Sequence, residues 1–176
     1  MRAQFWSFDV IFAIVIFIIS VSTLALIWYN LSSQTAAVSS GGVDAMQQNL
    51  QQLQSDLLSQ GSPPDWSSVV TANSVASWSN VTVGLGNGSG TQLSMQKVAA
   101  LEAMSNYDYQ ATKSMLGVGY DYYITIRTNS TYMRIGENPS DYNAVSEQVV
   151  DRPVIVGGRA AHMQIIVWTN TSFGVS

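Results

Sequence analysis

The sequence predicts an α+β fold, in which a long N-terminal hydrophobic helix is followed by a small antiparallel β-rich globular domain with covering helices. Three observations predict it: an uncharged apolar run near the N-terminus, apolar residues at helical spacing in the middle of the chain, and alternating apolar and polar residues towards the C-terminus. We therefore expect a hydrophobic helix over 1–30, a polar hinge with an amphipathic helix over 31–64, and an α+β domain over 65–176.

The N-terminal apolar run extends from Val10 to Tyr29 and carries no charged residue. About 20 residues at ~1.5 Å each give a helix of ~30 Å, the hydrocarbon thickness of a bilayer. The run is longer than the ~7–15 apolar residues of a cleaved secretory signal, so we interpret it as a membrane-spanning helix. Arg2 is the only Lys or Arg before Lys97, which favours a cytoplasmic N-terminus and an extracellular position for the domain over 65–176.

Asp9 lies directly before this run. A carboxylate at the centre of a bilayer costs ~2.5–3.5 kcal/mol, and less near the interface, so such a residue usually has a partner. Two interpretations are open. Asp9 is an interfacial anchor that contacts headgroup water, or it pairs with Arg2 or the amino terminus of a neighbouring copy and fixes the axial register between packed helices.

The segment from Arg2 to Asp9, RAQFWSFD, followed by an uninterrupted apolar helix, resembles the N-terminus of archaeal type IV pilin-like surface filament proteins. In that family a short basic leader ends in Gly or Ala, a Gln often follows, and an acidic residue comes a few positions later. The resemblance implies cleavage by a prepilin peptidase between Ala3 and Gln4, followed by polymerisation by the pilus assembly machinery. It also implies that the helices form the filament core, for which we expect Gln4, Phe5, Phe8, Asp9, Ile11, Ile14, Ile16, Phe17, Ile18, Leu24, Leu26 and Tyr29.

The region over 31–64 is small and polar at its start and amphipathic at its end. Each glycine of Gly41-Gly42 weakens a helix by about 1 kcal/mol relative to alanine, so we predict a break there. Asp44 is then expected to cap a second helix over Ala45 to Gln60, which Gly61 and the two prolines after it end. Its apolar residues recur at spacings of four, three and four, and we expect them to pack against the chain's own sheet rather than to form a two-heptad coiled coil: Met46, Leu50, Leu53 and Leu57.

The region after Trp66 combines short helices with strands. Helical spacing predicts helices over Ser94 to Ser105 and Asp108 to Leu116, the second ended by Gly117 in a left-handed conformation. A β-prone stretch over Ser77 to Leu85 precedes these helices. Alternating apolar and polar residues predict four strands after them: Asp121 to Arg127, Tyr132 to Ile135, Gln148 to Val156 and Ala161 to Thr169. Gly157-Gly158-Arg159 is expected to turn the chain between the last two strands.

The composition excludes several classes of function. Charged residues make up 10% of the chain and the net charge is −4, while the seven Lys and Arg do not cluster in sequence. Nucleic acid and anionic lipid headgroups are poor partners for such a chain, because both need a concentrated basic field. The absence of cysteine excludes disulfides, thiolate metal sites and a cysteine nucleophile.

Catalytic and ligand-binding motifs are not found in the sequence. His162 is the single histidine, placed on the polar side of the last strand, and no G-x-S-x-G motif accompanies it. The glycine run from Gly84 to Gly90 lacks the Lys-Ser/Thr of a phosphate-binding loop, so we interpret it as a flexible loop. Glu137 and Asp141 lack the spacing of a calcium loop. We therefore expect no enzyme activity, no cofactor and no metal site.

Two other residue classes are compatible with an exposed surface role. Five asparagines begin N-x-S/T sequons, and they are either acceptors for N-glycosylation or unmodified surface residues: Asn30, Asn80, Asn87, Asn129 and Asn170. The many Tyr and Trp residues after Trp66 are expected mainly in the core, although Tyr and Trp on a low-charge surface also suit subunit contacts or carbohydrate stacking.

The sequence as a whole favours a structural subunit of an extracellular pilus-like filament. Its partners would be the membrane before assembly and identical subunits in a homopolymer afterwards, because lipid and then neighbouring helices would cover the same apolar surface. The alternative is a single-pass, membrane-anchored surface adhesin or minor pilin-like accessory protein.

Overall fold

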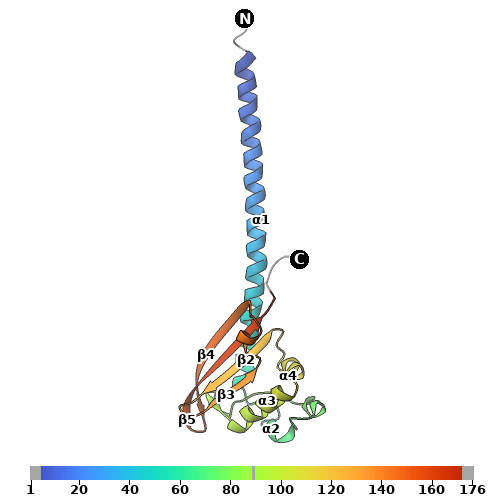
Figure 1. Cartoon of the computed structure of the whole chain (residues 1–176), viewed down its shortest axis with the longest axis vertical. Coiled ribbons are helices and arrows are strands. Elements are labelled where there is room, and N and C mark those ends of the chain that lie inside the picture. The colour runs from blue at the N-terminus through green and yellow to red at the C-terminus, as the bar shows by residue number, and fades with distance from the viewer. Residues whose placement is uncertain (1–4, 89, 172–176) are drawn as a thin grey trace. The chain divides into compact units, whose positions relative to one another are not determined.

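The computed structural model describes the backbone of residues 5–88 and 90–171, and the side chains of residues 10–27, 42–88 and 90–171. The chain divides into two compact units with the boundary between Gly42 and Val43. Figure 1 shows the helices and strands of both units.

The first helix, α1, comprises Phe5–Leu58. The predicted break at Gly41-Gly42 is wrong, because the backbone is helical across both glycines. The predicted cap at Asp44 is wrong for the same reason, and the expected second helix is the last part of α1. A penalty of about 1 kcal/mol for each glycine is small when long helical segments propagate from both sides.

The amphipathic end of α1 supplies one layer of the core of the second unit. The four residues of the predicted stripe are each at most 1% exposed: Met46, Leu50, Leu53 and Leu57. Polar side chains beside the stripe bond to the rest of the domain. Asn49 Oδ1 accepts a hydrogen bond from the Gly119 amide at 3.1 Å, and Arg152 Nε of the sheet donates to Gln54 Oε1 at 3.0 Å.

After α1 the chain forms two backbone segments that pack against each other, 59–62 and 82–86, which we call the double loop; the predicted strand over Ser77 to Leu85 is not formed. Only isolated bridges form there, Ser62 with Thr82 and Gly86 with Leu93. Residues 84–88 form a loop, as predicted, and its first part is closely packed, because a Cβ on Gly84 would clash with the Gly61 nitrogen and one on Gly86 with the Leu58 carbonyl oxygen. These glycines allow two backbone segments to touch.

A buried lysine holds this double loop together. Lys97 is 6% exposed, and its Nζ donates to the carbonyl oxygens of Gln60 at 2.8 Å and Gly86 at 3.0 Å. Burial lowers the pKa of Lys97, and the negative charge of Asp65 opposes that shift. The ammonium group thus replaces backbone hydrogen bonds that the irregular loop does not make.

Short helices cover the domain (Figure 1). They are α2 (Trp66–Val69), the 3₁₀ helix η1 (Val75–Trp78), α3 (Met95–Tyr107), α4 (Tyr109–Met115) and the 3₁₀ helix η2 (Pro139–Asp141). The two predicted helices are confirmed as α3 and α4. Asp108 caps α4 by accepting a hydrogen bond from the Ala111 amide at 2.9 Å, and Gly117 after its end has the predicted positive φ of 67°.

The sheet has five strands in the order β1-β4-β5-β2-β3. They are β1 (Gln92–Leu93), β2 (Asp121–Arg127), β3 (Tyr132–Gly136), β4 (Ser146–Val156) and β5 (Arg159–Thr169). The four predicted strands from Asp121 onward are confirmed, and Gly157 and Gly158 form the hairpin turn with φ of 58° and 77°. The α+β class is also confirmed, but the expectation of an antiparallel sheet is wrong: β1 pairs in parallel with β4, so the sheet is mixed.

One face of the sheet forms the core. The apolar residues on that face are buried on all four long strands: Tyr122, Ile124, Ile126, Met133, Ile135, Val154, Val156, Ala161, Met163, Ile165 and Val167. Trp66 and Trp168 are also buried, as the core interpretation of the aromatics predicted, whereas Tyr107, Tyr132 and Tyr142 are exposed.

Two stacked tyrosines make the polar part of this core. The rings of Tyr109 and Tyr122 lie 5.1 Å apart, the Tyr122 hydroxyl is 3.1 Å from Ser105 Oγ, and the Tyr109 hydroxyl donates to Asp121 Oδ1 at 3.1 Å. Burial raises the pKa of Tyr122 to about 12, although the Ser105 hydrogen bond acts in the opposite direction. Burial raises the pKa of Tyr109 as well. Both phenols are therefore neutral across the physiological range.

Candidate functional site

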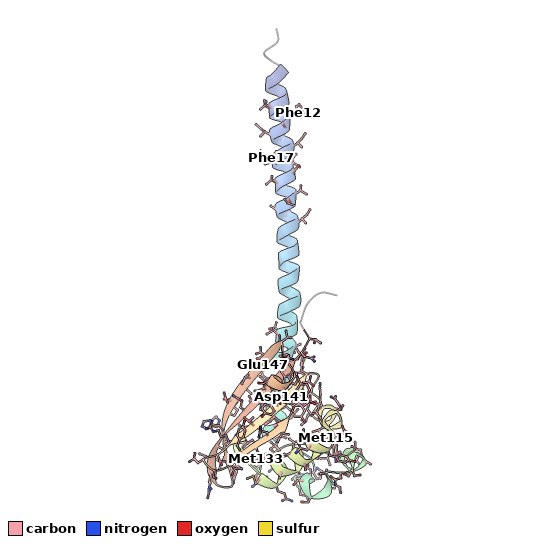
Figure 2. All side chains as sticks on the ribbon, in the orientation of Figure 1. Phe12, Phe17, Met115, Met133, Asp141 and Glu147 are labelled. Carbon is pink, nitrogen blue, oxygen red and sulfur yellow. The ribbon has the colours of Figure 1, made fainter. Side chains whose placement is uncertain are left out.

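The apolar part of α1 is the most prominent surface of the chain. The segment Val10–Ile27 is long and apolar enough to cross a membrane, with a mean hydropathy of 3.0, and none of it is buried within the chain. Figure 2 shows side chains such as Phe12 and Phe17 projecting outward from the helix. Phe12 is 65% and Phe17 is 68% exposed. Apolar surface of this extent needs a cover of lipid or protein.

Two of the three hydroxyl groups within this segment, those of Ser20 and Thr23 but not that of Ser22, are bonded to the backbone of the helix. Ser20 Oγ donates to the Ile16 carbonyl oxygen at 2.8 Å, and Thr23 Oγ1 donates to the Ile19 carbonyl oxygen at 2.8 Å. Both bonds are of the i to i−4 kind that Ser and Thr make inside helices. Neither hydroxyl hydrogen needs water or a partner helix, which lowers the free energy of moving the segment into hydrocarbon.

The residues predicted for a filament core fall into two groups. Those with described side chains are all exposed on the helix, namely Ile11, Ile14, Ile16, Phe17, Ile18, Leu24 and Leu26. Gln4 lies outside the described residues. For the others only the helical backbone is described, so the predictions for their side chains lie outside the described part of the chain: Phe5, Phe8, Asp9 and Tyr29.

The structure adds residues to this surface that the predicted set omits. Six further large side chains are about half exposed or more: Val10, Phe12, Val15, Ile19, Val21 and Ile27. They lie on the same segment of the helix as the predicted residues and are exposed like them. The signal that identifies them is the absence of any polar stripe in the run, since a helix that is apolar all round needs cover all round.

A second surface, which the sequence did not predict, is a concavity of about 880 Å³ on the face of the sheet opposite the core. We call it the outer groove. Residues of β2, β3, β4, β5 and the loop between β2 and β3 line it: Thr125, Arg127, Thr128, Asn129, Tyr132, Asp151, Arg159, Ala160, His162 and Gln164. Its components are far apart in sequence, so only the strand pairing reveals it.

Strand register explains how the groove acquires positive charge. Arg127 pairs with His162 on β5 and with Tyr132 on β3, so the three side chains form one row across the sheet. Arg159 reaches the same groove from the hairpin end, where its Nη1 donates to Ser130 Oγ at 3.4 Å. The sequence pattern indicated that Lys and Arg were scattered, but the fold brings these two arginines and the histidine together.

The predicted glycosylation sites are accessible where the structure describes them. Asn80, Asn87, Asn129 and Asn170 are all exposed, as an acceptor asparagine must be. The side chain of Asn30 lies outside the described residues. Asn129 also lines the outer groove.

The remaining candidates for chemistry stay separate. His162 is exposed on the outer face of β5, as predicted. Glu137 Oε1 accepts a hydrogen bond from the Tyr142 hydroxyl at 3.2 Å. Within the described part of the chain, no three His, Asp or Glu side chains are grouped so that they could hold a metal ion.

Comparisons with known proteins add nothing to this geometry. No protein-family model, curated protein or solved structure matches the chain. The chain thus has an apolar segment near its N-terminus, which could be a membrane anchor or a signal sequence, and an α+β domain with its own core.

Proposed function

We propose that this chain is a structural subunit of an extracellular pilus-like filament. In this proposal the helices of identical subunits pack together along Val10–Ile27 to form the filament core, and the globular domains lie outside. Before assembly the same helix is inserted in the cytoplasmic membrane with its N-terminus in the cytoplasm.

The observation that carries the proposal is the complete exposure of an all-round apolar helix on a chain whose other part is already a finished domain. The domain forms its core from residues between Met46 and Trp168, so it does not need the segment Val10–Ile27 for that core. The helix presents hydrocarbon in every direction. A bundle of identical helices covers such a surface on all sides, as lipid does.

The N-terminal residues give further support by resemblance. The segment RAQFWSFD is similar to the processing site of archaeal type IV pilin-like proteins, and it implies a prepilin peptidase cut between Ala3 and Gln4. A structural role also agrees with the sparse charge of the chain, because 10% charged residues limit repulsion between crowded domains.

Electron microscopy of material sheared from the cell surface tests the proposal. An antibody against the domain over 43–171 is expected to label fibres along their whole length. If the protein is found only as isolated molecules embedded in membrane, the filament proposal is wrong and a membrane-anchored adhesin or accessory protein replaces it. The intact mass of the native protein reports removal of the first three residues and any attached glycan in the same measurement.

A substitution at Asp9 tests how neighbouring helices align. If its carboxylate pairs with the amino terminus or Arg2 of a neighbouring copy, Asp9→Ala is expected to abolish filaments while the protein still inserts in the membrane. Unchanged assembly would eliminate the pairing and leave Asp9 as an interfacial anchor.

A further inference from the structure

The outer groove has the residues of a binding site for a charged ligand, and it concentrates positive charge in a chain of net charge −4. Arg127 and Arg159 line it together with His162, against the single carboxylate of Asp151. Across residues 10–27, 42–88 and 90–171, no carboxylate lies within ion-pair distance of either arginine. Both guanidinium groups are thus available to an external anion.

Arg127 and His162 lie directly opposite each other on paired strands, where Cβ atoms are ~4.5–5.5 Å apart. The Arg127 guanidinium and the His162 imidazole are therefore close enough to contact one ligand, to which both can donate hydrogen bonds.

The other lining residues suit hydroxyl groups and a sugar ring. Thr125, Thr128, Asn129 and Gln164 bring hydroxyl and amide groups that both donate and accept hydrogen bonds. Tyr132 is 55% exposed, and the guanidinium carbon of Arg134 lies 5.4 Å from its ring centroid. An exposed tyrosine ring is a surface on which a sugar ring can stack.

We propose that the outer groove binds an acidic oligosaccharide, with Arg127 and Arg159 contacting its carboxylates and Tyr132 stacking against a ring. The volume of about 880 Å³ lies within the usual range for ligand sites. Planar guanidinium groups match carboxylates in a two-bond geometry. The carboxylate of Asp151 and the small number of basic residues disfavour a polyphosphate ligand such as nucleic acid. The proposal does not depend on filament assembly.

Binding is tested with the full chain in detergent, by calorimetry with trigalacturonic acid and with its methyl ester as a neutral probe of the same rings. We expect saturable binding of the acid and at least tenfold weaker binding of the ester, because the ester cannot form charge-assisted hydrogen bonds with the two guanidinium groups. Equal binding of the ester, or no binding of either probe, would overturn the proposal.

Variants separate a built site from general charge attraction. Arg127→Gln and Arg159→Gln are each expected to weaken binding about tenfold or more, whereas Arg127→Lys, which keeps the charge but loses the fork, is expected to weaken it less. Arg152→Gln is the matched control, since Arg152 is on the same hairpin but bonds Gln54 of α1. Equal weakening by Arg152→Gln would contradict the site. A thermal melt of each variant shows that the domain remains folded.

Two competitor probes test the class of ligand. The proposal expects inorganic sulfate and a triglutamate peptide, at the same concentration of charge, to displace trigalacturonic acid only weakly. Equal displacement by sulfate would overturn the proposal in favour of a simple anion patch, and equal displacement by triglutamate would overturn it in favour of an acidic peptide partner. Tyr132→Ala should weaken the binding of the trisaccharide more than the binding of sulfate, because only the trisaccharide has a ring that can stack on Tyr132.

Discussion

Leu24 and Leu53 belong to the same helix, yet Leu24 is 67% exposed and Leu53 is 1% exposed. None of the segment Val10–Ile27 is buried by the described part of the chain, whereas the apolar residues in the last turns of α1 are buried in the core of the domain. The apolar residues of one helix therefore act in two ways. Those after Val43 stabilise the domain, and those of Val10–Ile27 need a cover of lipid or protein.

The same substitution in both regions gives the largest expected contrast. Leu53→Ala removes a buried side chain from the core and is expected to lower the free energy of unfolding of the domain by ~2–5 kcal/mol. Leu24→Ala removes an exposed side chain and is expected to leave that free energy unchanged. Urea unfolding followed by tryptophan fluorescence measures both free energies. Equal changes for the two variants would contradict the different roles of the two regions.

A charge placed in each region gives the next contrast. Ile18 and Val69 are 56% and 57% exposed, so exposure alone predicts that both tolerate arginine. Ile18→Arg is expected to reduce membrane insertion, because arginine near the centre of a spanning helix costs ~2.5–3.5 kcal/mol. Val69→Arg on α2 is expected to have no effect. The fraction of protein in carbonate-washed membranes reports the result, and normal insertion of the Ile18 variant would contradict a membrane-spanning role.

A smaller effect is expected from the buried ammonium group of the domain. Lys97→Met leaves the carbonyl groups of Gln60 and Gly86 without their donor and is expected to cost ~1–3 kcal/mol of domain stability, partly offset by the lower cost of burying a thioether. Gln96→Met, on the exposed neighbouring position of α3, is the control and is expected to change stability by less than ~0.5 kcal/mol. Chemical unfolding compares the two variants.

The smallest effect depends on pH and involves Tyr122. Tyr122→Phe removes the hydrogen bond with Ser105 and is expected to lower stability by ~0.5–1.5 kcal/mol at pH near 8. The pKa of Tyr122 in the fold, about 12, exceeds the ~10 of an exposed tyrosine, so the folded state holds the proton more tightly. This contribution is complete below pH ~10 and is lost as the pH rises through the folded value.

The difference between wild type and Tyr122→Phe should therefore narrow between pH ~8 and ~11, since phenylalanine has no proton to lose. Urea unfolding at both pH values measures it. Tyr107→Phe, at an exposed position, serves as the control and should show no such change. A constant difference for Tyr122→Phe would show that its phenol does not titrate with unfolding.

Local patterns predicted most of the helices and strands, because their signals are periodic and close in sequence. The alternation of Asp121 to Arg127 gave the bounds of β2, and Gly117 marked the end of α4. What failed depends on contacts between distant segments. Strand β1 has two residues, and only its pairing with β4 defines it. The close packing of Gly84 and Gly86 was not predicted either, because the backbone that packs against them follows Leu57 and is distant in sequence.

The two candidate sites also differ in whether local sequence patterns or contacts between distant segments define them. The apolar surface of α1 could be predicted, since every residue of a continuous run contributes to it. The outer groove could not, because Arg127 and His162 are brought together by the register of β2 and β5. A pattern of isolated basic residues in sequence says nothing about their separation in space until the strand order is known.

The back-bonded hydroxyls of Ser20 and Thr23 have a consequence for any fibre built on this rod. With both engaged on their own backbone, Ser22 carries the one hydroxyl of Val10–Ile27 that remains for a hydrogen bond to a neighbouring helix. Hydrocarbon contacts discriminate weakly between neighbouring rotations of a subunit about its long axis. In the proposed filaments few directed bonds would thus set the rotation, and more than one helical twist is expected among filaments from a single preparation.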